Sequence, residues 1–157
     1  GLSDNGNVAL VAGTDPAQVI DSNLYVPSLP YASGTFSDGV VWADLFAGAL
    51  GVGAGPSLAG GSNFAFGGAQ TRDGSSPSLL SQVGSYLGSV GGSADPGALY
   101  VLAGGGNNAR AALEAIAIDG APLLRTVLGT AVRYAQDLGS MVDQLQAAGA
   151  TDIVVWN

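Results

Sequence analysis

The chain has 157 residues, of which 47% are hydrophobic and 10% charged, a composition that is typical of one globular domain and excludes a disordered chain. Four arginines stand against twelve acidic residues, and the net charge of −8 argues against nucleic acid or an anionic membrane surface as a partner. Cysteine and histidine are absent, which excludes disulfides, thiolate metal sites and imidazole catalysis within these residues.

The first third of the chain is rich in turn residues. Residues 1–7 are polar, and Asp4 or Asn5 is suited to cap a helix or to form an Asx turn. Residues 8–35 have no sustained periodicity and contain three prolines, so we predict an ordered surface excursion.

Apolar residues between 40 and 50 recur at helical spacing and predict a helix of about a dozen residues. Ser37 or Asp38 is expected to cap this helix, and Trp42 is expected to pack at its margin. After a glycine-rich passage, the alternation around Phe64 and Phe66 predicts a brief strand or a turn.

The second half has clearer periodicity. Residues 78–87 predict an amphipathic helix, 98–103 a buried strand after a turn at 94–97, and 109–117 a further helix. The longest helical pattern starts at Leu123, with an interruption expected near Gly129 or Gly139, and Gly149 ends it.

Residues 152–156 predict a second buried strand. A strand, helices and another strand make a parallel crossover, for which a right-handed connection is expected. The sequence therefore predicts an α/β fold with a parallel sheet, in a single domain over residues 1–157.

The strand at 98–103 stops at Gly104, Gly105 and Gly106, which are followed by Asn107 and Asn108. Ligands of open α/β sheets bind beyond the carboxyl ends of the strands, and a glycine turn there allows close approach to the backbone. The Asn107 amide can then donate to an oxygen that becomes negative during a reaction. The alternatives are a turn that only caps the strand, and a phosphate cradle, which the missing P-loop lysine and the charge of −8 disfavour.

Four motifs occur in the order and rough spacing of the SGNH, or GDSL-type, lipases and esterases. They are Leu-Ser-Asp-Asn-Gly-Asn at 2–7, Gly-Thr-Phe-Ser-Asp-Gly at 34–39, Gly-Ser-Asn-Phe-Ala-Phe-Gly-Gly-Ala at 61–69 and Gly-Gly-Gly-Asn-Asn at 104–108. The chain most resembles the branch that includes plant GDSL lipases and bacterial autotransporter esterases, and the closing residues 149–157 are similar to the next strand of that branch.

The resemblance implies a flavodoxin-like SGNH-hydrolase sandwich, with helices on both faces of a parallel sheet, that is incomplete in this chain. It implies ester hydrolysis by a serine nucleophile, with a histidine base that an aspartate orients. Carried over by position, the oxyanion hole takes the backbone N–H of Gly61 and the side chain of Asn107, and Asn108 stands where the family has aspartate.

The departures from the family concern the catalytic triad. Gly1 occupies the position of the nucleophilic serine, and the downstream Asp-x-x-His block is absent. The chain thus resembles the N-terminal half of an SGNH hydrolase, and this piece alone is expected to expose two apolar sheet edges. Of the nearby polar residues, Ser3 is expected to start a helix, Asp4 and Asp38 to cap helices, and Asn63 to bond the backbone locally.

Two functions remain open. The first is a piece of a secreted carboxylic-ester hydrolase, split, processed or trimmed, that contributes the oxyanion hole, is inactive alone and acts on a small ester or lipid-like substrate. The remainder of the hydrolase, for instance a second chain with the Asp-x-x-His block, supplies the missing residues. The second is a non-catalytic module whose glycine-rich pocket binds a small acyl or glycan ligand. Neither needs a cofactor or a metal. We expect no membrane span and a secreted or cell-surface bacterial location, which the lack of cysteine fits.

Overall fold

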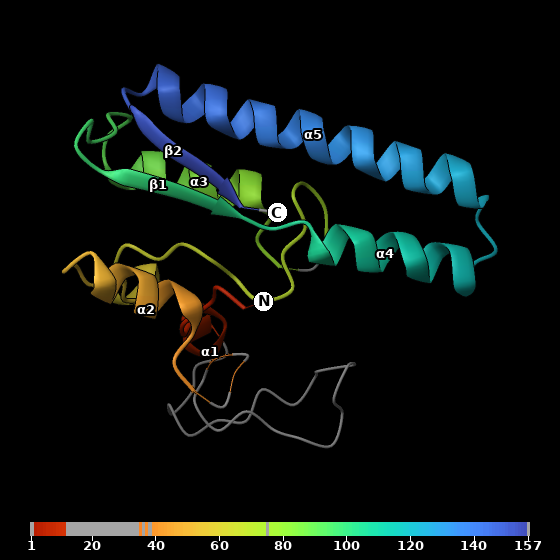
Figure 1. Ribbon diagram of the computed structural model, residues 1–157, viewed down its shortest axis with the longest axis horizontal. Coiled ribbons are helices and arrows are strands. Elements are labelled where there is room, and N and C mark those ends of the chain that lie inside the picture. The colour runs from red at the N-terminus through yellow and green to blue at the C-terminus, as the bar shows by residue number, and fades with distance from the viewer. Residues whose placement is uncertain (1, 12–34, 36, 38, 75, 157) are drawn as a thin grey trace. The chain divides into compact units, whose positions relative to one another are not determined.

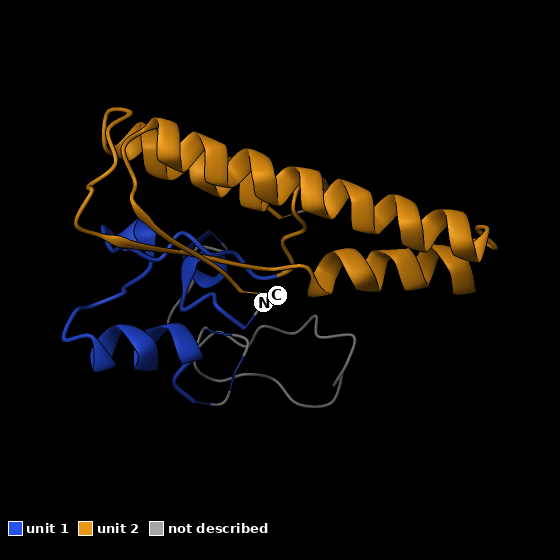
Figure 2. Ribbon diagram, turned by 45° about the horizontal axis from the view of Figure 1, so that its top comes forward, with its two compact units in different colours: residues 1–67 blue, residues 68–157 orange. Residues whose placement is uncertain are grey.

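The computed structural model describes residues 2–11, 35, 37, 39–74 and 76–156. Its contacts divide the chain into two compact units, Gly1–Gly67 and Gly68–Asn157 (Figure 2). The fold is mixed α/β, with several helices and a small parallel sheet. None of the helices in the described ranges is both long and apolar enough to cross a membrane.

The first unit contains helix α1 (Asn7–Val11), helix α2 (Trp42–Ala49) and the short 3₁₀ helix η1 (Ser57–Ala59). Helix α1 corrects the prediction of irregular chain from residue 8, while residues 12–34 lie outside the described part of the chain. It forms because the buried Asp4 carboxylate accepts the N–H groups of Gly6, Asn7 and Val8, which caps the first turn as expected.

Helix α2 confirms the helix predicted between residues 40 and 50, but not its cap. Val41 is the N-cap residue and makes no side-chain capping bond. The Ser37 hydroxyl instead accepts the Gly39 N–H at 3.2 Å, upstream of the helix, and Asp38 lies outside the described residues. Between residues 61 and 69 the structure has turns and one isolated parallel bridge, Pro56–Asn63, rather than a strand.

The second unit contains α3 (Leu79–Ser89), β1 (Leu99–Ala103), α4 (Gly106–Ala117), α5 (Leu123–Ala147) and β2 (Asp152–Trp156) (Figure 1). Strands β1 and β2 pair in parallel, with Leu99 opposite Asp152 and Ala103 opposite Trp156. The predicted strands, their parallel pairing and the helical crossover between them are therefore confirmed.

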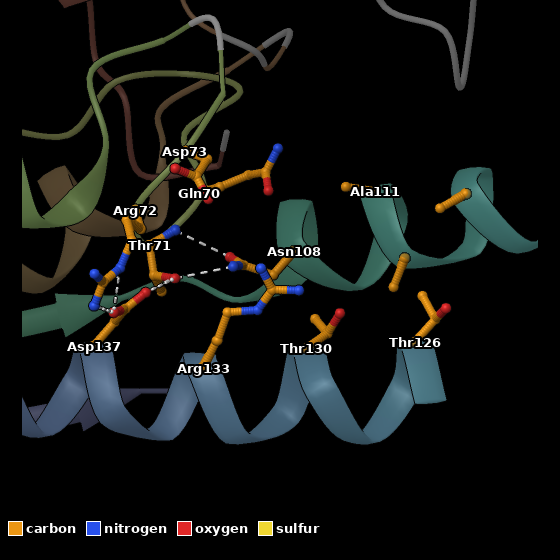
Figure 3. Close-up of a pocket in the computed structure, with 12 residues that line it drawn as sticks. Gln70, Thr71, Arg72, Asp73, Asn108, Ala111, Thr126, Thr130, Arg133 and Asp137 are labelled. Carbon is orange, nitrogen blue, oxygen red and sulfur yellow. Dashed lines mark hydrogen bonds and ion pairs between the residues drawn. The ribbon is translucent and has the colours of Figure 1, made fainter. Parts of the chain in front are cut away.

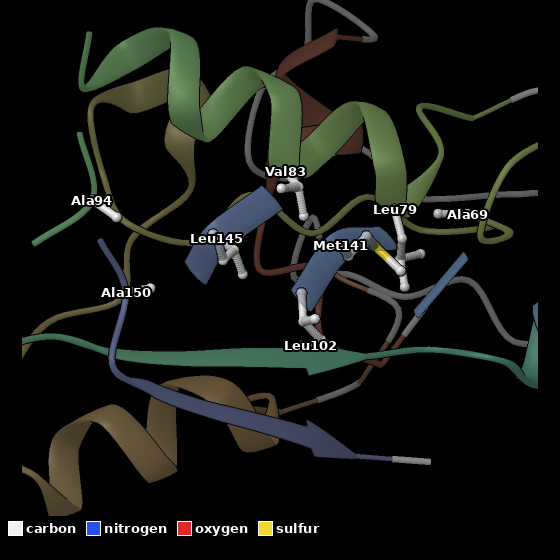
Figure 4. Close-up of a cluster of buried hydrophobic side chains, with 8 residues drawn as sticks. All are labelled: Ala69, Leu79, Val83, Ala94, Leu102, Met141, Leu145 and Ala150. Carbon is white, nitrogen blue, oxygen red and sulfur yellow. The ribbon is translucent and has the colours of Figure 1, made fainter. Parts of the chain in front are cut away.

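The core of this unit lies between α3, α5 and the sheet. Leu79 and Val83 of α3 point toward Met141 and Leu145 of α5, and Leu102 of β1 completes the cluster (Figure 4). Met141 is fully buried because it lies on the helix face that also carries Leu145, one turn further on. This packing fixes the position of β1, and hence of the glycine turn that follows it.

Helices α4 and α5 form an antiparallel hairpin that continues beyond the carboxyl end of β1 (Figure 1). Helix α4 begins at Gly106, three residues earlier than predicted, and α5 runs without interruption through Gly129 and Gly139. Gly149 follows the end of α5 with a φ of +108°, in agreement with its predicted role.

The sheet has two strands in the described residues, and the prediction that residues 152–156 are a buried strand is wrong, because much of β2 is open to solvent. Val154, Val155 and Trp156 are exposed. Parallel strands are normally buried on both faces, so this small sheet leaves apolar surface that further strands or helices usually cover.

Candidate functional site

The turn between β1 and α4 requires glycine. Gly105 has a φ of +114°, and a Cβ on it would lie 2.9 Å from the ring of Tyr134. A Cβ on Gly104 would lie 2.5 Å from the side chain of Leu79. The Tyr134 hydroxyl donates to the Gly104 carbonyl at 3.0 Å, so α5 holds the turn against the end of the strand. At these two glycines, where a ligand was predicted to approach the backbone closely, the side chains of Leu79 and Tyr134 pack against the turn instead.

Asn107 lies in the first turn of α4, immediately after this glycine turn. Its side-chain Nδ2 donates to the Ala69 carbonyl at 2.8 Å, which fixes the plane of the amide. A side-chain amide nitrogen carries two hydrogens, so this bond uses one and the other can be donated to a ligand. The N-terminus of α4 adds a partial positive charge at the same place. The arrangement is chemically suited to bind an oxygen with developing negative charge.

Asn108 exchanges two hydrogen bonds with Thr71. Its Oδ1 accepts the Thr71 N–H at 3.1 Å, and its Nδ2 donates to the Thr71 hydroxyl at 2.9 Å. The same hydroxyl donates to Asp137 at 2.7 Å. Asn108 therefore acts as acceptor and donor at once, which an ionised aspartate cannot do. The network gives a physical reason for asparagine at this position.

Asp137 is an almost completely buried carboxylate in the middle of α5, with 1% of its surface exposed. Arg72 donates to it from Nε at 2.9 Å, in addition to the bond from Thr71 (Figure 3). Burial by itself raises the pKa of the Asp137 carboxyl, but the hydrogen bonds from Arg72 and Thr71 outweigh burial and hold that pKa below its usual value. Asp137 is ionised at neutral pH and ties the loop after Gly68 to α5.

A polar groove of about 200 Å³ lies beside this network. Arg133 of α5 and Asn108 of α4 point into it, and Gln70 and Asp73 line its other side (Figure 3). Because charges of both signs line the groove, it has no strong preference for an anion or a cation. A second groove, of about 510 Å³ and with a mainly apolar lining, lies on the same pair of helices beside Gly104–Gly106.

Gly61, the other predicted oxyanion donor, lies in the first unit. A Cβ at this position would be 2.0 Å from the Gly55 carbonyl oxygen, so the close contact of the two backbone segments requires glycine. The Gly61 N–H donates to the Pro56 carbonyl at 3.0 Å. The donor that the resemblance assigns to an oxyanion is therefore already engaged in the local turn.

The polar residues of the opening block bind the loop that carries Gly61. Asn7 is fully buried, and its Nδ2 donates to the carbonyls of Asn63 and Ala65. Asp4 also accepts the Gly67 N–H at 2.7 Å. Nothing in the local sequence marks Asn7 as a structural residue except its position in the first matched motif.

The neighbouring residues show two further outcomes. Asn63 accepts the Ala65 N–H through Oδ1, which confirms the expected local bond, and donates to the Ser3 carbonyl. Helix α1 begins at Asn7 and is capped by Asp4, so Ser3 does not start the helix as predicted. The Ser3 hydroxyl instead accepts the Trp42 indole N–H at 3.1 Å.

The predicted site residues are thus distributed over the chain. Gly61 belongs to the first unit, Asn107 belongs to the second, and Gly1 lies outside the described residues. Their convergence at one site stays a prediction. In the described ranges there is no cluster of three or more acidic side chains suited to hold a metal ion.

Comparison of the chain with family models, curated proteins and solved structures finds no match.

Proposed function

We propose that this chain is the part of a serine ester hydrolase of the SGNH type that supplies the oxyanion hole. The observation that carries the proposal is the fixed amide of Asn107, held by the Ala69 carbonyl in the first turn of α4, at the carboxyl end of a parallel strand. A parallel sheet with helical crossovers is the core of the implied sandwich, and the exposed strands would pair within that larger sheet.

In this proposal Asn107 donates its second N–H to the carbonyl oxygen of the ester. As a nucleophile attacks, charge moves onto that oxygen, and the hydrogen bond strengthens in the transition state. The N-terminus of α4 stabilises the same charge. Gly61 is the second donor, with its N–H shared between the Pro56 carbonyl and the oxyanion.

The catalytic serine, aspartate and histidine come from elsewhere in the assembled enzyme. Gly1 occupies the place that the resemblance gives to the serine, and no histidine is present in the sequence. In this proposal the remainder of the hydrolase, with its Asp-x-x-His block, supplies these residues, whether on a second chain or on the same one, and a small ester or lipid-like molecule is the substrate. A secreted or cell-surface bacterial location remains part of the proposal.

A second candidate is a non-catalytic binding module with the same pocket. The engaged N–H of Gly61 favours it, because an N–H that already donates to Pro56 binds a short-lived oxyanion less well. A module of this kind would bind an uncharged acyl or glycan ligand and would not need a complementary chain.

Complementation distinguishes the two candidates. The purified chain is mixed with a chain that supplies the serine and the Asp-x-x-His block of the resembled branch, and hydrolysis of p-nitrophenyl butyrate is followed. The proposal expects turnover only in the mixture, with a loss of about 100- to 1,000-fold in kcat for Asn107→Ala. Gln146→Ala, which removes an exposed amide from α5, is the matched control and should keep full activity. Turnover that is insensitive to Asn107→Ala would refute the proposed role.

A further inference from the structure

Four charged side chains line the polar groove of the second unit, and two of them are already paired. Arg72 and Asp137 neutralise each other through a bond from Nε at 2.9 Å. Asp73 makes no hydrogen bond or ion pair with any described residue. The Nε of Arg133 donates to the Gly129 carbonyl of its own helix at 3.4 Å, which leaves its terminal N–H groups for another acceptor. One positive and one negative charge in the groove are therefore left for a ligand.

Uncharged polar groups in the groove are also available. Within the part of the chain that the structure describes, the side chains of Gln70, Thr126 and Thr130 have no hydrogen-bond partner. Thr126, Thr130 and Arg133 follow one another at spacings of four and three residues, which places them on one face of α5 (Figure 3). This wall of the groove therefore presents two hydroxyls and a guanidinium to the same ligand.

The facing wall on α4 is apolar and consists of short side chains. Ala111, Ala112 and Ala115 line it, and their methyl groups leave space between the helices. The groove has a volume of about 200 Å³. Since a water molecule occupies about 30 Å³ in the liquid, this space matches a ligand of about six or seven non-hydrogen atoms with a short aliphatic part.

The two open charges decide the class of ligand. A simple anion would pair with Arg133 and meet repulsion from Asp73, and a simple cation would meet the reverse. We propose that the polar groove binds a small zwitterionic amino acid, with its carboxylate on Arg133, its ammonium group on Asp73 and its aliphatic part against the alanines of α4. A guanidinium matches the planar fork of a carboxylate. The groove contains neither Gly61 nor Asn107, so this site is separate from the proposed oxyanion hole.

The test is a titration of the ¹⁵N-labelled chain at neutral pH with L-alanine, propanoate and ethylamine, followed by amide chemical shifts. The last two probes each lack one of the two charges of L-alanine. The backbone amides of Thr71, Asn108 and Thr130, which line the groove, should shift with L-alanine and reach saturation. Propanoate and ethylamine should bind at least about five-fold more weakly, because each loses one ion pair and leaves the opposite charge of the groove without a partner.

Two variants remove the charges of the groove one at a time. Arg133→Gln and Asp73→Asn should each weaken the binding of L-alanine at least about five-fold. Arg125→Gln and Asp143→Asn are the matched controls, because they remove the same charges from exposed positions of α5 outside the groove. Each control should change the affinity less than about two-fold. If Arg133→Gln loses its dispersed spectrum, Asp73→Asn decides the outcome, since Asp73 is an exposed loop residue.

Several results would overturn the inference. Equal affinity for propanoate and L-alanine would make the groove an anion site, and equal affinity for ethylamine would make it a cation site. Shifts confined to other surfaces, such as β2, would place the ligand elsewhere. The absence of a saturable shift with both L-alanine and β-alanine, whose two charges lie farther apart, would show that the groove binds no small amino acid. The measurement needs no turnover, so its outcome is separate from that of the proposed hydrolase.

Discussion

Replacement of Asn108 by aspartate tests the polar network of the second unit most sharply. The Asn108 Nδ2 and the Asp137 carboxylate lie 2.9 Å and 2.7 Å from the same Thr71 hydroxyl oxygen. Asn108→Asp removes the donor to that hydroxyl and places a second carboxylate less than about 6 Å from Asp137.

The lost hydrogen bond is worth about 1 kcal/mol. The repulsion between the carboxylates reaches about 3 kcal/mol at an effective dielectric constant of about 20, and Arg72 and solvent at the half-buried Asn108 reduce it. We therefore expect Asn108→Asp to lower the free energy of unfolding by about 2–3 kcal/mol at about pH 7.

Urea unfolding measures this loss. Trp156 in β2 reports on the second unit when Trp42 in the first unit is replaced by phenylalanine. The double variant Asn108→Asp with Asp137→Asn has the same net charge as the starting protein and restores one carboxylate and one amide around Thr71. A double-mutant cycle should give a favourable coupling of at least about 1 kcal/mol.

The pH dependence provides a second readout. The native pKa of Asp137 is lowered from its ordinary value of 3.8, so its contribution to stability is complete above pH 3.8 and is lost as the pH falls through the native pKa. Repulsion from Asp137 raises the pKa of the carboxyl introduced at position 108, so the penalty of Asn108→Asp should shrink as the pH falls toward about 4. A variant as stable as the starting protein at neutral pH, with no coupling in the cycle, would refute the network.

Three further outcomes are expected. Gly105→Ala forces an alanine into a left-handed conformation against the Tyr134 ring and should lower the free energy of unfolding in urea by more than about 2 kcal/mol. Gly106→Ala has open space around its Cβ and should leave that free energy nearly unchanged. Equal effects of the two variants would contradict the packing of the turn. Gly61→Ala should destabilise the first unit by at least about 2 kcal/mol in unfolding followed by Trp42 fluorescence, and Gly53→Ala, which meets no neighbour, is its control. The purified chain alone should not hydrolyse p-nitrophenyl butyrate above the buffer rate; turnover abolished by Ser3→Ala would show that Ser3 is the nucleophile.

The sequence predicted those elements of the second unit that depend on local pattern. Strands β1 and β2 and helix α3 follow from their apolar spacing, and the Ser78 hydroxyl caps α3 at 3.2 Å. The long α5 was also predicted, but the pattern did not show which half is buried. Leu124 and Leu128 are exposed because the hairpin continues beyond the sheet, and Met141 and Leu145 are buried against it.

Features that depend on distant partners were missed. Helix α1 is a single turn whose capping carboxylate, Asp4, also binds Gly67, 63 residues away. Asp137 lies one helical turn before Met141, and an acidic residue on the apolar face of a long helix was a detectable signal. Its partners Arg72 and Thr71 are 65 and 66 residues away, and no local pattern points to them.

In the proposed function, Gly61 and Asn107 belong to one oxyanion site. An experimental structure of the protein assembled with its complementary chain measures it directly, through the distance between the Gly61 backbone nitrogen and the Asn107 Nδ2. Two donors that share one oxygen lie within about 6 Å of each other, and we predict a separation in this range. A separation well beyond about 6 Å in the assembled protein would contradict it.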